Sequence, residues 1–206
     1  MSVERMARAR ATGDGSTARQ RRSFGAWASR ARVPLGFVLA ALFIWRAHPS
    51  PWTLAIGLPI AAAGLALRAA AAGHIRKNDV LAVSGPYRYT RNPLYLGSAL
   101  LALGFVIAAA SWLLAALAAA MLFVIYLPVI RREEAFLAAR FGAEFEAFRR
   151  TVPRLLPRFP PAPRTAEGGG FSWRLYWRHR EYNALLGFLA LAAVVVLKWL
   201  GRGWIP

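Results

Sequence analysis

The chain is poor in the residues that most often carry metal or redox chemistry. It contains no cysteine, only three histidines and only nine acidic residues among 206. The lack of cysteine excludes disulfide bonds, zinc–thiolate sites and thiol nucleophiles. The histidines are too few and too scattered for a convincing metal site. Apolar residues, in contrast, make up 57% of the chain, and lysine and arginine together number 27. This composition, with its long apolar runs, indicates a membrane protein of a single domain.

The basic residues stand at the ends of the apolar runs. Eight precede the first run, residues 73–93 hold four, and residues 131–181 hold eleven. The opposite side of the membrane keeps only Arg46, Lys198 and Arg202. This positive-inside pattern places the N-terminus and residues 73–93 in the cytoplasm and the C-terminus outside. The net charge of +18 therefore requires no nucleic-acid partner, and it favours contact with anionic membrane lipids.

The apolar runs predict about five transmembrane helices. The second and last runs approach the roughly 20 residues needed to cross a hydrocarbon core about 30 Å thick. Residues 94–130 are too long for one helix, so we expect a hairpin broken near residues 108–112. The first run lies between Arg32 and Arg46 and spans only if both arginines snorkel. No small-residue cleavage site follows it, which favours an uncleaved span. The predicted spans are about 33–48, 52–72 (with Arg68 inside), 94–110, 113–130 and 182–200.

The sequence therefore predicts an all-α, polytopic membrane helix bundle with cytoplasmic accessories. Residues 1–32 are basic and lack apolar periodicity, which indicates disorder or contact with anionic lipid. Residues 131–150 predict an amphipathic cytoplasmic helix, because four apolar side chains recur on one stripe. Residues 158–180 combine a Pro/Gly linker with an aromatic, arginine-rich interfacial helix. The membrane core is assigned to 33–157, an additional C-terminal helix to 181–206, and the apolar stripe to Leu137, Phe141, Phe145 and Phe148.

The stretch GPYRYTRNPLYLG at residues 85–97 joins two apolar runs and carries the most informative pattern. Asn92 and Pro93 predict a helix start, since asparagine can cap exposed N–H groups and proline fits the first helical position. Such a helix end attracts a carboxylate or phosphate, and Arg88 and Arg91 add positive charge. Aromatic rings nearby could cover a flat heterocycle or face a cation. The alternative is that these residues only anchor the chain at the membrane interface. The three rings are Tyr87, Tyr89 and Tyr95.

Two acidic residues, Glu133 and Glu134, follow at the far end of the predicted hairpin. Because the two helices of a hairpin meet at their ends, we expect these acids to face Asn92. A helix N-terminus, aromatic faces and carboxylates at the lipid boundary suit a zwitterionic ligand with a flat ring and a cationic centre. The alternative is surface ion pairing of the acids with Arg131 or Arg132.

In this order, these motifs resemble the membrane-integral methyltransferases of the isoprenylcysteine carboxyl methyltransferase and phospholipid methyltransferase group. The family signature is Arg-His-Pro-x-Tyr, a hydrophobic stretch, and Glu-Glu. This chain has RNPLY, the hairpin, EE, and then FGAEFEAFRRTVPRLLP, so the resemblance covers roughly residues 70–157. Asn92 stands where the signature has histidine, and asparagine cannot titrate near neutral pH. Val129 stands where the eukaryotic carboxyl methyltransferases carry an arginine, which argues against a prenylcysteine carboxylate as substrate.

The resemblance implies that S-adenosylmethionine binds in a cytoplasmic cleft over the hairpin. Leu81 and Ala82 would line the cofactor pocket, and Glu133 would hold polar groups of the cofactor. The remaining contacts would come from Tyr87, Arg91, Asn92, Pro93, Leu94 and Tyr95. The acceptor would be a lipophilic molecule or lipid that enters from the bilayer, and no metal is implied.

The expected chemistry is in-line displacement at the sulfonium methyl, accelerated mainly by holding the nucleophile and the methyl group in line away from water. An amine or hydroxyl acceptor must lose a proton, for which Glu134 is the candidate base, whereas a carboxylate or thiolate needs none. Two other functions stay open from the sequence. One is a membrane reductase that uses a nicotinamide cofactor, and the other is a non-catalytic lipid-binding membrane protein.

Overall fold

The computed structural model describes residues 37–38, 40–76, 80–163 and 169–201. The basic segment 1–32 and the start of the first apolar run lie outside these residues. Within the first run, residues 40–46 are helical. The described part of the chain forms helices and no strand, which confirms the predicted all-α class. Its elements are α2 (Pro51–Ala72), η1 (Gly85–Arg88), α3 (Pro93–Ala109), α4 (Trp112–Met121), η2 (Leu122–Tyr126), α5 (Leu127–Thr151), α6 (Trp173–Arg178) and α7 (Tyr182–Gly201).

Three of the described helical stretches are long and apolar enough to cross a membrane: Pro51–Ala72, Trp112–Thr151 and Tyr182–Gly201. Helix α3 is shorter, with 17 residues. At 1.5 Å per residue it is about 25 Å long, slightly less than a hydrocarbon core. The protein is thus a membrane helix bundle.

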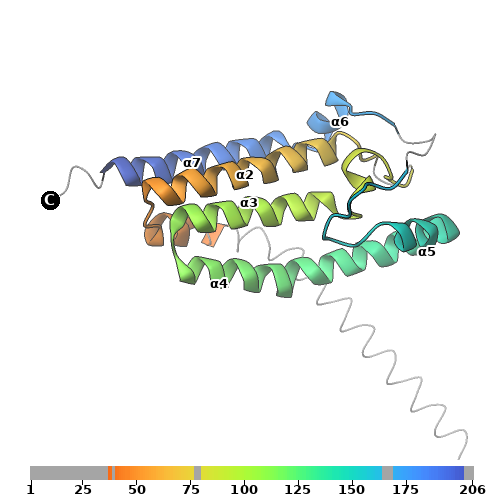
Figure 1. Cartoon of the computed structure of the whole chain (residues 1–206), viewed down its shortest axis with the longest axis horizontal. Coiled ribbons are helices and arrows are strands. Elements are labelled where there is room, and N and C mark those ends of the chain that lie inside the picture. The colour runs from red at the N-terminus through yellow and green to blue at the C-terminus, as the bar shows by residue number, and fades with distance from the viewer. Residues whose placement is uncertain (1–36, 39, 77–79, 164–168, 202–206) are drawn as a thin grey trace, which may run out of the picture.

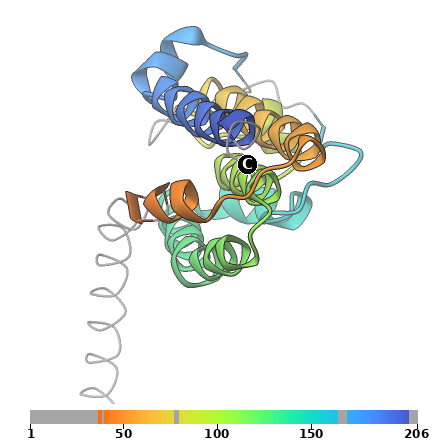
Figure 2. The ribbon, with the colours of Figure 1, turned by 90° about the vertical axis from the view of Figure 1, so that its left-hand side faces the viewer.

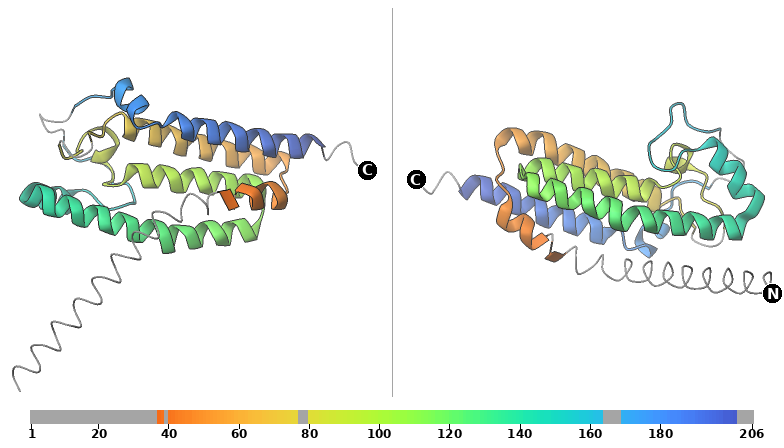
Figure 3. Two further views of the ribbon diagram at one scale, coloured as in Figure 1. Left: turned by 180° about the vertical axis from the view of Figure 1, so that it is seen from behind. Right: turned by 90° about the horizontal axis from the view of Figure 1, so that it is seen from below.

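The long helices lie side by side, so the connecting segments gather at two opposite ends (Figure 1). One end holds residues 73–76 and 80–92, the second half of α5, and α6. The other end holds the start of α2, the α3–α4 turn and the end of α7, as both further views also show (Figure 3). Helix α3 lies between the α2–α7 pair and α4 (Figure 2). This arrangement puts the two sequence segments with the predicted site residues at one end of the bundle.

Helix α2 begins at a capping box. The Ser50 N–H donates to Thr53 Oγ1 at 2.8 Å, and the Thr53 N–H donates to Ser50 Oγ at 3.2 Å. Pro51 occupies the first turn, where its missing N–H costs nothing. These contacts satisfy backbone groups that would otherwise lack partners at the helix start.

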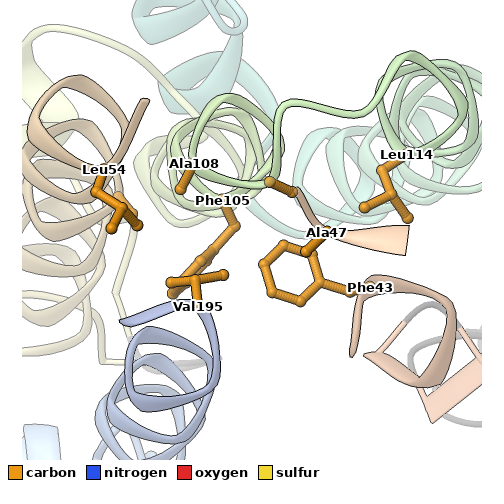
Figure 4. Close-up of a cluster of buried hydrophobic side chains, with 9 residues drawn as sticks. Phe43, Ala47, Leu54, Phe105, Ala108, Leu114 and Val195 are labelled. Carbon is orange, nitrogen blue, oxygen red and sulfur yellow. The ribbon is translucent and has the colours of Figure 1, made fainter. Parts of the chain in front are cut away.

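Helices α2 and α3 pack with their backbones in close approach. A Cβ atom added at Gly64 would lie 2.6 Å from the Gly97 carbonyl oxygen, and one added at Gly97 would lie 2.7 Å from the Gly64 carbonyl oxygen. Only glycine allows this separation, which is typical of membrane helices whose association depends on van der Waals packing. A cluster of buried apolar side chains continues this packing toward the α3–α4 turn (Figure 4). It includes Phe43, Ala47, Leu54, Phe105, Ala108, Leu114 and Val195.

The predicted hairpin is confirmed, with its break at Ala110. This residue adopts a left-handed conformation with φ 48°, and α4 begins after Ser111. Helices α4 and α5 then form one continuous stretch that contains a π-helical turn, η2. Pro128 follows this turn and cannot donate a backbone hydrogen bond, so a locally wider helix accommodates it.

A partly buried ion pair joins α2 to Glu181, the residue before α7. Arg68 donates from Nη2 to both carboxylate oxygens of Glu181, at 2.8 and 2.9 Å, and from Nε to Oε2 at 3.1 Å. Arg68 also donates to the hydroxyl of Ser98 on α3. An arginine inside a membrane span is costly unless it is paired, so Glu181 and Ser98 explain how α2 accommodates this charge.

Candidate functional site

A cleft lies at one end of the bundle, between residues 75–92 (of which 77–79 are not described), the start of α3, and α5 from Glu133 to Phe148. All ten residues that were assigned to the cofactor or to proton transfer line this cleft: Leu81, Ala82, Tyr87, Arg91, Asn92, Pro93, Leu94, Tyr95, Glu133 and Glu134. The structure therefore brings the loop, the helix start and the acidic pair to one place. Their roles toward a ligand stay predictions.

Glu134 is the centre of the polar network in the cleft. Its Oε1 accepts from Arg91 Nε at 3.0 Å and from Asn92 Nδ2 at 3.2 Å, while its Oε2 accepts from Arg154 Nε at 2.8 Å. The side chains of Glu134 and Arg91 are only 8% and 7% exposed. Both carboxylate oxygens are thus occupied by the protein itself. This geometry fits a positioning role better than that of a base, and the predicted base role stays untested.

Asn92 occupies the N-cap position of α3 as predicted, but its side chain does not cap the helix. Instead, Asn92 Nδ2 donates to Glu134 and to the Arg154 carbonyl oxygen, the latter at 2.9 Å. The expectation of a capping asparagine is therefore wrong in this respect. A cap would require Asn92 Oδ1 to accept from a backbone N–H of α3, and the two bonds that Nδ2 donates, one of them to an ionised carboxylate, fix the side chain in another orientation.

Arg91 also bonds within the protein. Besides Glu134, its guanidinium donates from Nη1 to the carbonyl oxygens of Arg149 at 2.9 Å and of Val152 at 3.2 Å. These carbonyls belong to the end of α5, where cationic groups are favourable. Arg91 lines the cleft, but its hydrogen bonds hold the end of α5 beside the start of α3.

A strap, defined here as residues 152–162, runs alongside residues 88–91. The Arg91 N–H donates to the Pro153 carbonyl at 2.9 Å, and the Arg158 N–H donates to the Tyr89 carbonyl at 2.9 Å. The Ala162 N–H donates to the Arg88 carbonyl at 3.0 Å. Sequence reasoning missed this pairing, because the strap carries no local pattern that identifies its partner.

The apolar stripe predicted on α5 faces the cleft. All four of its residues, Leu137, Phe141, Phe145 and Phe148, line the cleft, together with Ile75, Arg76, Val80 and Phe136. Phe145 is buried. The side chains that make α5 amphipathic therefore form an apolar wall for a ligand. The stripe was predicted from its helical spacing, but no local pattern indicates that it lines a cleft.

Gly142 breaks α5 in the middle of this stripe. It has φ 49° and ψ −120°, and a Cβ added there would meet no atom within 4 Å. The left-handed φ is the reason for glycine, since other residues are strained in this conformation. The turn lets Phe141 and Phe145 reach the same cleft from two separate helical segments.

Replacing Gly142 with alanine is expected to destabilise the protein by about 1–3 kcal/mol, the cost of a sparsely populated, positive-φ backbone conformation for a residue with Cβ. Gly187→Ala is the matched control, because Gly187 also has open space but lies within α7 without a positive φ. That change is expected to be neutral or slightly stabilising. Thermal unfolding of both variants in the same detergent measures the difference. Equal shifts for both would contradict the strain argument.

Tyr87 is the most unusual polar group in the cleft. It is 5% exposed, and its hydroxyl has no hydrogen-bond partner among the described residues. Burial, with smaller contributions from the charges of Glu133 and Glu181, raises the pKa of Tyr87 well above its ordinary value. The hydroxyl therefore stays protonated at neutral pH and is available as a donor. A buried polar group without a partner is costly and calls for a specific explanation.

Two tyrosines meet at the inner end of the cleft. The rings of Tyr95 on α3 and Tyr126 in η2 pack edge to face, with centroids 5.8 Å apart at 90°. Tyr95 lines the cleft, whereas Tyr126 lines a second, apolar cavity between α3 and α4. Tyr89 does not line the cleft and packs against Phe159 at 5.6 Å.

Comparisons with known proteins identify one family and two relatives, and both the family and one of the relatives are named as methyltransferases. The pattern of the phospholipid methyltransferase family matches residues 35–144, just over half of the chain. The cobalt-zinc-cadmium resistance protein CzcN of Cupriavidus metallidurans is 31% identical over 186 residues, which cover 85% of this chain and 81% of that protein. The protein-S-isoprenylcysteine O-methyltransferase of Schizosaccharomyces pombe is 32% identical over 84 residues, 41% of this chain and 36% of that enzyme. No solved structure matches the chain.

Proposed function

Since the chain belongs to the phospholipid methyltransferase family, we propose that it is a membrane methyltransferase that uses S-adenosylmethionine to methylate a lipophilic acceptor. The observation that carries the proposal is the hydroxyl of Tyr87, which is buried in the cleft with no partner among the described residues. A bound cofactor with ribose hydroxyls and a carboxylate offers the acceptor that this hydroxyl lacks.

The residues of the cleft fit the parts of this cofactor. The apolar wall of α5, with Leu81 and Ala82, suits the adenine ring. Glu133 is exposed at the cleft and can accept hydrogen bonds from ribose hydroxyls or from the amino group. The ring of Tyr95 suits the cationic sulfonium centre. Pro93 and Leu94 form the floor at the start of α3.

When bound, the cofactor supplies an activated methyl group on a sulfonium. The protein then has to hold the acceptor atom in line with that methyl group and exclude water, which is where most of the acceleration arises. We infer that Glu134 acts as a positioning residue, because Arg91, Asn92 and Arg154 occupy both of its oxygens. By the distribution of basic residues, the cleft opens to the cytoplasm.

The alternatives fit the cleft less well. A nicotinamide cofactor carries two phosphates, yet Arg91 already bonds Glu134 and two carbonyl oxygens, and Arg76 is the other basic residue that lines the cleft. A purely lipid-binding protein has no use for a buried, unpaired hydroxyl. The metal resistance in the name of one relative is not carried over, because the described residues hold no group of three or more potential metal ligands.

Tyr87→Phe tests the proposal, because the change should have opposite effects on folding and on binding. Without ligand, the variant is expected to be as stable as the parent or slightly more so, since the buried hydroxyl has no partner to lose. Affinity for S-adenosylmethionine should fall by roughly twofold to tenfold, the value of one hydrogen bond of about 0.5–1.5 kcal/mol. Calorimetric titration of the purified protein measures the affinity, and thermal unfolding measures the stability.

Tyr89→Phe is the matched control, because Tyr89 lies in the same loop but outside the cleft. It should leave the affinity unchanged. Titration of the parent with reduced nicotinamide cofactors separates the reductase alternative. If S-adenosylmethionine and its demethylated product do not bind the parent, the proposed function is wrong.

A further inference from the structure

The strap, residues 152–162, carries two large apolar side chains that stay exposed. Leu156 is 77% exposed and Phe159 is 78% exposed. The ring of Phe159 contacts Tyr89 edge to face, with centroids 5.6 Å apart, but this contact covers little of it. Neither side chain lines the cofactor cleft. Neither the buried core nor the cleft therefore accounts for these two residues.

The strap lies where the bundle meets the boundary of the membrane. After α5 the chain returns to the start of α3 (Figure 1), and the Arg91 N–H donates to the Pro153 carbonyl at 2.9 Å. Farther along the strap, the Arg158 N–H donates to the Tyr89 carbonyl at 2.9 Å. The apolar helix α3 begins directly after this segment, at Pro93. The exposed side chains of the strap therefore stand at the level of the lipid headgroups.

The backbone of the strap suits a layer that offers few hydrogen-bond partners. Four of its eleven residues are proline and have no N–H group to desolvate. The N–H groups of Arg158 and Ala162 are already bonded, to the carbonyls of Tyr89 and Arg88. An irregular segment meets lipid at a high cost when its N–H groups lack partners, so this pattern lowers the cost of contact with the membrane surface.

Basic side chains surround the two apolar residues. Residues 147–163 contain four arginines and no acidic residue. Arg150 is exposed at the end of α5, and Arg154 stays 43% exposed although its Nε bonds Glu134. Apolar side chains beside arginines match a membrane surface, where acyl chains meet phosphates and anionic headgroups. The position at headgroup level together with this charge favours the lipid surface over a soluble protein partner.

We propose that the strap is a membrane-seating element, in which Leu156 and Phe159 insert into the headgroup boundary at the cleft end of the bundle. Arg150 and its neighbours bind the phosphates of anionic lipids at the same surface. The insertion also acts on the cleft, because the Arg154 carbonyl accepts from Asn92 Nδ2 at 2.9 Å. The lipid surface thereby helps to hold the strap side of the cleft in place. This seating is independent of which ligand the cleft binds.

Spin labels measure the depth of the strap, and the absence of native cysteine allows single-cysteine variants of the full chain. Leu156→Cys and Phe159→Cys carry the label on the strap. Glu144→Cys is the water-exposed control, because Glu144 is exposed on α5. Leu189→Cys is the lipid-facing reference, because Leu189 is 53% exposed within the span of α7. In vesicles of phosphatidylcholine and phosphatidylglycerol, the collision rates of each nitroxide with oxygen and with a water-soluble nickel chelate are compared.

The ratio of oxygen to nickel collisions at positions 156 and 159 should exceed the ratio at position 144 by at least about threefold and lie between it and the ratio at position 189. In vesicles of phosphatidylcholine alone it should fall by about twofold, because the arginines lose their anionic partners. Either strap variant decides the question if the other does not fold.

Equal ratios at the strap positions and at position 144 would overturn the seating of the strap in lipid. Dipolar broadening between labels on the strap would also overturn it, since a second copy of the chain would then cover this surface. Equal ratios in the two kinds of vesicle would refute the binding of anionic headgroups by the arginines.

Discussion

Replacing Glu134 with alanine is expected to destabilise the cleft end of the protein by about 3–5 kcal/mol, the usual cost of leaving a buried charge unpaired. The charge in question is Arg91, whose side chain is only 7% exposed and whose pairing atom lies 2.9 Å from Glu134 Oε1. Arg154 contributes less, because its side chain is 43% exposed and water screens it. The cost should appear where Glu134 holds the strap against the 88–92 segment.

Trypsin cleavage after Arg158 measures this local opening. Proteolysis of a transiently open segment follows the population of the open form, so the Glu134→Ala variant should be cut roughly a hundredfold faster or more. Glu144→Ala is the matched control, because Glu144 is exposed on the same helix. The fragment that begins at Phe159 is quantified by mass spectrometry. Equal cleavage of parent and variant would show that Glu134 does not hold the strap.

Glu134→Gln separates positioning from proton transfer in the active enzyme. If Glu134 is a base, the variant loses activity at every pH and the acid limb of the pH profile disappears. If it positions Arg91 and Asn92, part of the activity persists with an unchanged pH profile, because one acceptor oxygen remains.

The sequence predicted the helices of the bundle better than the contacts between them. The apolar runs predicted α2 and α7, and residues 108–112 predicted the hairpin break at Ala110. Both features can be read from neighbouring residues, because a span depends on the length of one apolar run. The π-helical turn was missed although its signal was present. Pro128 stands inside an apolar run, where a regular helix would need its absent N–H.

The candidate site was predicted as a set of residues and not as a network. The order of the motifs predicted that Asn92 and Glu134 lie close together. In the structure, Asn92 Nδ2 lies 3.2 Å from Glu134 Oε1. The third partner, Arg154, could not be deduced, because its contact depends on how the strap returns across residues 88–91. The predicted capping by Asn92 was wrong for the same reason. Its side chain instead bonds Glu134, a charged residue from a distant part of the sequence.

The ion pair between Arg68 and Glu181 shows the same limit inside the membrane. The sequence placed Arg68 within a span and supplied no partner for it. Glu181 directly precedes the last span and therefore lies at the same end of the bundle as the C-terminal half of α2. Its position could have identified it as a partner for Arg68. The structure joins them at 2.8 Å, with side-chain exposures of 23% and 10%. The pair joins the start of α7 to α2, whereas Val195 packs in the buried apolar cluster farther along the helix.

Glu181→Leu alone is therefore expected to cost about 2.5–3.5 kcal/mol, because Arg68 stays within a membrane span with Ser98 as its only other side-chain partner among the described residues. The double variant Arg68→Met, Glu181→Leu should recover most of this loss, since a buried pair replaced by apolar residues is often neutral. The coupling energy from the double-mutant cycle is the quantity to measure, by denaturant unfolding in mild detergent. Asn183→Ala, an exposed change in the first turn of α7, should shift stability by no more than about 0.5 kcal/mol. Additive single effects would mean that the two charges do not depend on each other, and that α7 is held by its apolar contacts alone.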